Sequence, residues 1–142
     1  MDLKRMYDGV IGAVVGDALG VPYEFSSREA MKNVTIEMKG YGTHSQPKGT
    51  WSDDSSMMLA SLDCVRRDRC DTEGLIDAFR LWDRQGMYSA DGMVFDIGIG
   101  TSNALSNTNP EMINGYMAYG SNDTYNNGNG SLMRILPVCI YA

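Results

Sequence analysis

The sequence predicts an all-α protein, and three observations lead to this prediction. Apolar residues recur at helical spacing in several segments of the 142-residue chain, capping residues precede those segments, and no segment shows the apolar–polar alternation of a strand. The length fits one domain, and an apolar content of 43% is ordinary for a globular protein.

The first helix is expected in "DLKRMYDGVIGAVVGDALG", ending before Pro22. A stripe of apolar residues at helical spacing supports it: Leu3, Met6, Val10, Ile11, Val14 and Ala18. A second strip consists of small residues: Gly9, Gly12, Ala13, Gly16 and Gly20. Each glycine inside a helix costs ~1 kcal/mol relative to alanine. We therefore expect this strip to have a packing reason or a role in a site.

The middle of the chain predicts irregular structure followed by two further helices. Residues 23–49 read as loop with at most a short helix near Ser27 to Lys32. "SDDSSMMLASLDCVRR" predicts a helix with one apolar face formed by Met58, Leu59, Leu62 and Val65. "DTEGLIDAFRLWDRQG" predicts another, with Asp71 or Thr72 as cap, a core stripe of Leu75, Ile76, Phe79 and Trp82, and Gly86 as its end.

The last third of the chain carries weaker signals. "MVFDIGIGTSNALSN" predicts a fourth helix, weakened by Gly98 and Gly100, and residues 108–130 predict a polar loop. A final helix is expected to start at Ser131. Its apolar pattern runs to the last residues without a polar cap or glycine stop. We therefore expect residues 1–142 to be the N-terminal portion of a single larger domain, or a partner to cover this end.

Composition excludes several classes of function. The net charge of −6 disfavours binding of nucleic acid through its phosphates. No segment approaches the ~20 apolar residues of a membrane span, and the N-terminus lacks the apolar core of a signal peptide. Three cysteines without metal-type spacing suit a reducing compartment. We expect a cytoplasmic protein with no membrane partner. With His44 as the single histidine, sites built on histidines are excluded, and a bound metal would be a hard cation held mostly by oxygen.

The stretch "GTWSDDSSMML" places Asp53 and Asp54 at the start of a helix. The simpler interpretation is capping, because acidic residues and Ser52 satisfy free amides and complement the helix dipole. A second interpretation is metal binding. Ser52, Asp53 and Asp54 offer a hydroxyl and two carboxylates that could bridge two hard cations ~3.5 to 4 Å apart. Both can hold together, since a cap can also be a ligand.

Other candidate site residues lie outside this stretch. Asp17 is either a structural hydrogen-bond hub, which we favour, or a site residue. Glu24 is a loop carboxylate, a metal ligand or a proton-transfer group, and Asp96 is a cap or a substrate-facing acid. In "NNGNGSLMR", the glycines and the following helix start suit either an ordinary turn or a phosphate cradle.

Four segments in this order resemble the ADP-ribosylglycohydrolase family: "GxxxGDALGxPYE", "GTWSDDSSMML", "FDIGIGTSNAL" and "NNGNGSLMRILP". The resemblance implies an all-α fold, two Mg²⁺ or Mn²⁺ ions, and hydrolysis of the glycosidic bond that joins ADP-ribose to a protein side chain or a small acceptor. An ADP-ribosylated protein or a small ADP-ribose conjugate is then the expected partner.

The resemblance also assigns roles to residues. Ser52, Asp53 and Asp54 match the family's metal triplet, and Glu24 matches a glutamate beside the metals, so that Glu24, Asp53 and Asp54 are the expected catalytic groups. Asp17 is similar to the family's structural aspartate. Substrate would contact Asp96 and the loop that holds the diphosphate: Asn126, Asn127, Gly128, Asn129 and Gly130.

One departure from the family pattern changes the expectation. Family members carry a second D-x-D-[ST] metal motif in their C-terminal part, and this chain has none after Arg134. We therefore expect about half of the metal ligands to come from a C-terminal half, without which the chain would be inactive or would bind metal weakly. The alternatives are a non-catalytic ADP-ribose-binding or structural relative, and an all-α bundle whose caps mimic the motifs.

Overall fold

The computed structural model describes residues 2–121 and 128–141, and the all-α prediction is confirmed. Six helices, two short 3₁₀ turns and one small hairpin occur in the described residues. In chain order they are α1 (Leu3–Gly20), η1 (Val21–Tyr23), α2 (Arg28–Met31), η2 (Gly42–His44), α3 (Asp53–Arg66), α4 (Thr72–Gln85), α5 (Ile99–Ser106), β1 (Glu111–Ile113), β2 (Tyr116–Ala118) and α6 (Leu136–Tyr141).

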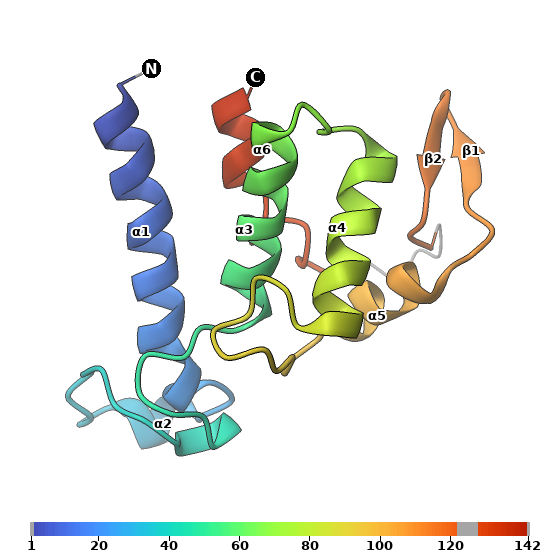
Figure 1. Cartoon of the computed structure of the whole chain (residues 1–142). Coiled ribbons are helices and arrows are strands. Elements are labelled where there is room, and N and C mark those ends of the chain that lie inside the picture. The colour runs from blue at the N-terminus through green and yellow to red at the C-terminus, as the bar shows by residue number, and fades with distance from the viewer. Residues whose placement is uncertain (1, 122–127, 142) are drawn as a thin grey trace.

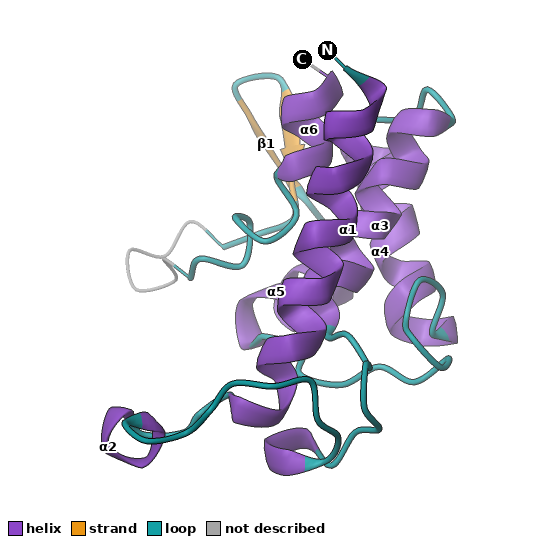
Figure 2. Cartoon of the chain, turned by 90° about the vertical axis from the view of Figure 1, so that its left-hand side faces the viewer, coloured by secondary structure: helices purple, strands orange, loops and turns teal. Residues whose placement is uncertain are grey.

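Helix α3 is central to the fold. It packs against α4 on one side and against α6 and α1 on others, so that α1, α3 and α4 stand side by side (Figure 1). The labelled chain ends lie together at one end of these helices (Figures 1 and 2). The loops between α1 and α3 gather at the opposite end, where α2 projects away from the helices (Figure 2). The start of α3 points toward these loops, and the candidate site lies there.

The core lies between α3, α4 and α5. It is a cluster of buried apolar residues: Met57, Ala60, Cys64, Ile76, Ala78, Phe79, Trp82 and Leu105. The prediction for α4 is confirmed, because Asp71 caps it by accepting a hydrogen bond from the amide of Gly74 and Gly86 ends it with a left-handed conformation. The predicted α3 helix is also confirmed, but of its predicted apolar face only Met58 is buried. Met57, Ala60 and Cys64 form its buried stripe, whereas Leu59, Leu62 and Val65 are only half-buried.

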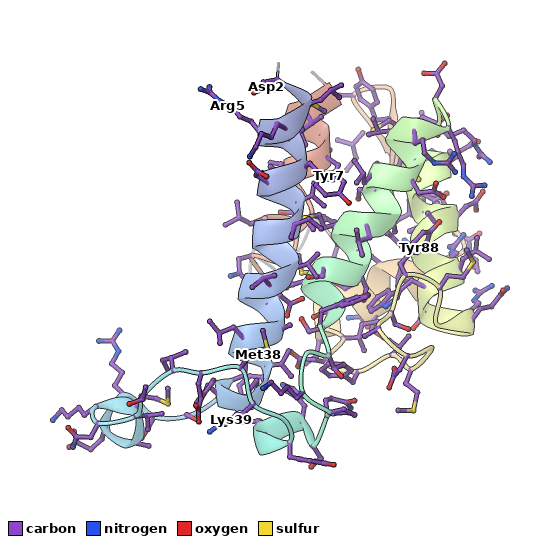
Figure 3. All side chains as sticks on the ribbon, turned by 60° about the vertical axis from the view of Figure 1, so that its left-hand side comes forward. Asp2, Arg5, Tyr7, Met38, Lys39 and Tyr88 are labelled. Atoms are coloured by element: carbon purple, nitrogen blue, oxygen red, sulfur yellow. The ribbon has the colours of Figure 1, made fainter. Side chains whose placement is uncertain are left out.

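Helix α1 is less covered by the rest of the chain than its apolar pattern suggests. Only Val10 and Ala18 are buried along it, while Leu3 is 79% exposed and Tyr7 is 71% exposed. Asp2 caps the free end, where it lies near Arg5 (Figure 3). A side chain on Gly9, Gly12, Gly16 or Gly20 would meet no atom within 4 Å. The glycine strip therefore faces open space along this part of the chain.

Three expectations for the last third of the chain are corrected. The fourth helix covers only Ile99–Ser106, because residues 93–98 form a loop in which Asp96 has a positive φ of 57°. The expected polar loop contains the antiparallel β1–β2 hairpin, which turns at Asn114 and Gly115. The final helix starts at Leu136 rather than Ser131, since residues 130–134 form turns and Pro137 fits a helix start. Within the described residues, no helix is long and apolar enough to cross a membrane.

Candidate functional site

The start of α3 is the centre of the candidate site. Ser52 caps the helix, because its Oγ accepts a hydrogen bond from the amide of Asp54 at 3.2 Å. The capping interpretation of this stretch is therefore confirmed. Asp53 is buried and Asp54 is exposed, so the two neighbouring carboxylates stand in different surroundings.

Asp17 fixes this start of α3 to α1. Its carboxylate accepts hydrogen bonds from the amide of Ser52 at 3.1 Å, from the hydroxyl of Ser52 at 2.8 Å and from the amide of Ser55 at 3.0 Å. Our prediction of a structural hub at Asp17 is confirmed. Ser52 Oγ donates to Asp17 and accepts from Asp54, which leaves one of its two lone pairs for a further partner.

Two cavities meet at this helix start. The larger one, about 740 Å³, is lined by Asp53, Asp54, Asp96, Arg134 and the described part of the glycine loop, Gly128 to Gly130. The smaller one, about 380 Å³, is lined by Asp17, Glu24, Asp54 and Ser55, and by Gly16 and Gly20 of the glycine strip. Asp54 borders both cavities. The structure thus brings together Glu24, Asp53, Asp54 and Asp96, which are separated by up to 72 positions (96 − 24) in the sequence.

The electrostatics of these acids follow from burial and crowding. Burial, with the negative charges of Asp54, Asp96 and Asp17, raises the pKa of Asp53 to about 7. Burial and the charges of Asp17 and Asp96 also raise the pKa of Asp54. The charge of Asp96 therefore acts on both acids of the pair. A cation at this place would relieve the repulsion.

Glu24 lies in a second acidic group with a histidine. His44 Nε2 is 2.6 Å from Glu24 Oε2 and 3.7 Å from Asp96 Oδ2. The pKa of Glu24 is raised, because burial and the neighbouring Asp96 outweigh the opposing hydrogen bond with His44. The ligand atoms of these three residues lie within 4.8 Å of one another. This group contains one imidazole and two carboxylates, so it agrees with our expectation that a bound metal would be held mostly by oxygen.

Arg134 is the cationic side chain of the larger cavity. Its guanidinium stacks on the ring of Phe79 at 5.1 Å and donates to the sulfur of Met57 at 3.7 Å. Burial lowers the pKa of Arg134, and the charge of Asp53 partly opposes that effect. No carboxylate of the described residues lies within ion-pair distance of this guanidinium. It is positioned to meet a negatively charged group in the cavity.

Sequence reasoning missed His44 and Arg134 as site residues. His44 lies 20 positions from Glu24, and only the packing of η2 against η1 brings the two together. Arg134 reaches the cavity from the turns before α6, and no local pattern marks it. Of the predicted loop residues, Gly128, Asn129 and Gly130 line the larger cavity, while Asn126 and Asn127 lie outside the described residues.

The sequence matches the profile of the ADP-ribosylglycohydrolase family over residues 2–142. The chain belongs to this family. Two relatives from Pseudomonas putida (strain GB-1) and Serratia proteamaculans (strain 568) are named ADP-ribosylarginine hydrolase Tri1, and they are 35% and 29% identical over 140 residues. These matches cover 98% of the chain but only 36% and 37% of the relatives.

A solved structure gives the same result for this ADP-ribosylglycohydrolase family member. A chain described as an ADP-ribosylglycohydrolase-related protein complex superposes with a TM-score of 0.66 at 27% identity. The match covers 96% of the present chain and 42% of the solved chain. The helical arrangement around α3 is therefore that of the corresponding part of a family structure.

Proposed function

We propose that this chain contributes the Glu24, Ser52, Asp53 and Asp54 side of a metal-dependent site that hydrolyses the glycosidic bond of an ADP-ribose conjugate. The observation that carries the proposal is the crowding of Asp53, Asp54 and Asp96 at the start of α3, where the pKa of Asp53 rises to about 7. Acids gathered in this way favour bound cations.

The donor set fits hard divalent cations. Carboxylate and hydroxyl oxygens are the ligands of Mg²⁺ and Mn²⁺, and Asp53, Asp54 and Glu24 offer carboxylates at the two cavities. Ser52 is buried and lines neither cavity, but its hydroxyl keeps one lone pair that would serve as a further ligand. A second observation supports this donor set. The buried hydroxyl of Ser55 has no hydrogen-bond partner among the described residues, and Ser55 borders the smaller cavity. Two cations would orient the ribose and polarise the bond to be broken.

The remaining residues of the site suit binding and proton transfer. Glu24, with its raised pKa, is suited to hold a proton and pass it to or from the reacting group. Asp96 faces the larger cavity, where it would contact ribose hydroxyls. Arg134 and the backbone of Gly128 to Gly130 would receive the diphosphate, which would allow an acidic chain to bind an anionic substrate.

Arginine-linked ADP-ribose is the first acceptor to test. Both curated relatives described above carry the name ADP-ribosylarginine hydrolase. This chain spans 36% and 37% of the length of these two relatives, and in our proposal further metal ligands come from the part of the fold that corresponds to the rest of their length.

The experiment compares cation binding and release of ADP-ribose from an ADP-ribosylated arginine peptide, with Mg²⁺, with Mn²⁺ and with EDTA. It uses the parent chain alone and with the C-terminal remainder of the Pseudomonas relative added as a separate polypeptide. Asp53→Asn and Asp54→Asn leave the Ser52 cap in place but remove charge, and we expect each to abolish release and to weaken Mn²⁺ binding at least tenfold. Asp83→Asn on the exposed face of α4 is the matched control.

The result also separates the enzyme from a non-catalytic relative. ADP-ribose binding is measured by calorimetry with Mg²⁺ and with EDTA. If ADP-ribose binds equally well in both, and no ADP-ribose is released with or without the added polypeptide, a binding function would replace the enzymatic proposal. Unchanged Mn²⁺ binding in both asparagine variants would leave Asp53 and Asp54 only the role of first-turn acids that complement the helix dipole.

A further inference from the structure

The turn η2 is built against the backbone that carries Glu24. Gly42, with a φ of 63°, lies so close to η1 that an added Cβ would stand 2.2 Å from the carbonyl oxygen of Pro22. Thr43 Oγ1 donates a hydrogen bond to the backbone oxygen of Glu24 at 2.6 Å. Nearby, Lys39 lies over the ring of Tyr23 at 4.1 Å, below the end of α1 (Figure 3). The segment 39–44 therefore fixes the chain path of residues 22–24 at several points.

His44 extends this contact to the Glu24 side chain and to a second loop. Its Nε2 is 2.6 Å from Glu24 Oε2 and 3.7 Å from Asp96 Oδ2. Its ring also packs near the rings of Phe25, which follows Glu24, and Phe95, which precedes Asp96. The centroid distances are 5.7 Å to Phe25 and 5.3 Å to Phe95. Each acid and its neighbouring phenylalanine thus hold the same imidazole, whose side chain is 13% exposed.

The backbone at these contacts is conformationally strained. Phe25 and Asp96 both have a φ of 57°, a left-handed backbone conformation that residues other than glycine adopt less often. Such conformations persist where surrounding contacts determine them, and they cluster at functional sites. Here both segments contact His44, and the Glu24 and Asp96 side chains also interact with each other.

The short distance between His44 and Glu24 is that of a hydrogen bond. Two ligands of one metal ion, each bonded at about 2.1 Å, stand roughly 3 Å or more apart. The 2.6 Å between His44 and Glu24 is shorter than that and is a strong hydrogen bond. In this arrangement the imidazole holds the carboxylate through that hydrogen bond, and a metal ion bound to these same two atoms would require them to move apart.

We propose that His44 is a positioning residue, which orients the Glu24 carboxylate and fixes its place relative to Asp96. The inference rests on the proposed function, in which Glu24 binds a cation or carries a proton. Partners that hydrogen-bond a ligating carboxylate commonly change metal affinity or activity by 10- to 100-fold when removed.

The test uses two variants that separate two properties of the imidazole, its N–H donor and its ring. His44→Phe keeps a ring between Phe25 and Phe95 but has no donor, and His44→Gln keeps an N–H donor without the ring. Mn²⁺ affinity is measured by electron paramagnetic resonance in the parent protein, alone or with the C-terminal polypeptide. We expect His44→Phe to weaken Mn²⁺ binding by roughly 10- to 100-fold and His44→Gln to recover most of that loss. Equal affinity in parent and His44→Phe would overturn the proposal, and so would a nitrogen coupling from His44 to bound Mn²⁺.

A double-variant cycle separates positioning from simple packing. In a Glu24→Gln background, the acid that His44 orients is gone, so His44→Phe should change Mn²⁺ affinity by less than about threefold. The same loss in both backgrounds would mean that His44 acts through packing alone. Circular dichroism of each variant checks that the helices are retained.

A measurement without metal keeps the inference distinct from the proposed function. The ring nitrogens of His44, observed by ¹H–¹⁵N NMR with EDTA present, should shift in Glu24→Gln and move less in Asp83→Asn. A shift without any Mn²⁺ binding by the parent would overturn the metal-dependent function and support the His44–Glu24 unit. No shift in Glu24→Gln would overturn the role of His44, whatever the outcome for cations.

Discussion

Helix α3 has two different interfaces. Toward α4 it packs through apolar side chains, with Met57 fully buried and Trp82 only 1% exposed. Toward α1 its clearest tie is polar, because the Asp17 carboxylate accepts hydrogen bonds from Ser52 and Ser55. The first interface supplies most of the core, and the second connects α1 to the acids of the candidate site.

This difference indicates where stability and function reside in the chain. The apolar α3–α4 interface stabilises the fold, so changes there should lower the stability of the whole protein rather than affect the candidate site alone. The polar α1–α3 interface positions the start of α3, so changes there should affect Asp53 and Asp54 more than the global fold. Four substitutions test this division.

The largest effect on stability is expected at the apolar interface. Trp82→Ala removes a buried aromatic side chain, and such changes cost about 3–5 kcal/mol through lost burial and a residual cavity. Urea unfolding followed by circular dichroism measures the free energy of unfolding. Leu81→Ala, its partly exposed neighbour on α4, is the control and should cost far less. Similar losses at the two positions would contradict the assignment of the core.

The next largest effect is expected at Asp53, at the start of α3, and concerns the pH dependence of stability. Its pKa in the folded chain, about 7, lies above the value of roughly 3.9 for an unfolded chain. Between these values the folded state binds more protons, so the free energy of unfolding of the metal-free protein falls as pH rises from about 4 to 7. Asp53→Asn should reduce this slope and stabilise the metal-free protein at pH 7.5.

Urea unfolding in EDTA at pH 5 and pH 7.5 measures this effect. Asp83→Asn is the control, because that acid is exposed on α4 and should leave the slope unchanged. An Asp53→Asn protein whose stability falls with pH as steeply as the parent would show that the Asp53 carboxylate is not the crowded group.

A moderate effect is expected at the polar interface. Asp17→Asn places an amide group, itself a donor, where the carboxylate accepts from three donors of Ser52 and Ser55. Leaving buried donors unpaired costs roughly 1–3 kcal/mol. Relative to the parent, Asp17→Asn should accelerate amide hydrogen exchange more at the start of α3 than in α4. Uniform acceleration across both helices would mean that the hub stabilises the whole fold.

The local features of this protein could be predicted from sequence, and the tertiary ones could not. Helix α4 could be read in full, since Asp71, the apolar stripe and Gly86 act within a few residues of one another. The hairpin was missed although Asn114 and Gly115 form the two-residue turn typical of such pairs. Its strands are only three residues long, too short for alternation to be visible.

The candidate site divides in the same way. Asp53, Asp54 and Glu24 could be proposed from residue type and motif, and the capping role of Ser52 followed from its place before a helix. His44 could not be proposed, because its partnership with Glu24 depends on how η2 packs on η1. A single histidine in the sequence gives no indication of this partnership.

The smallest effect is expected on the exposed face of α1. Gly12 lies inside the helix with no atom within 4 Å of an added Cβ, so Gly12→Ala should stabilise the described fold by about 0.5–1 kcal/mol through lower entropy of the unfolded chain. Urea unfolding of the chain alone measures this gain. The comparison is then repeated with the C-terminal polypeptide of the Pseudomonas relative. If that polypeptide covers the glycine strip, the alanine methyl group will oppose docking, and the gain seen in the chain alone will become a loss. A gain under both conditions would mean that the strip stays open and that α1 is held to the fold chiefly through Asp17.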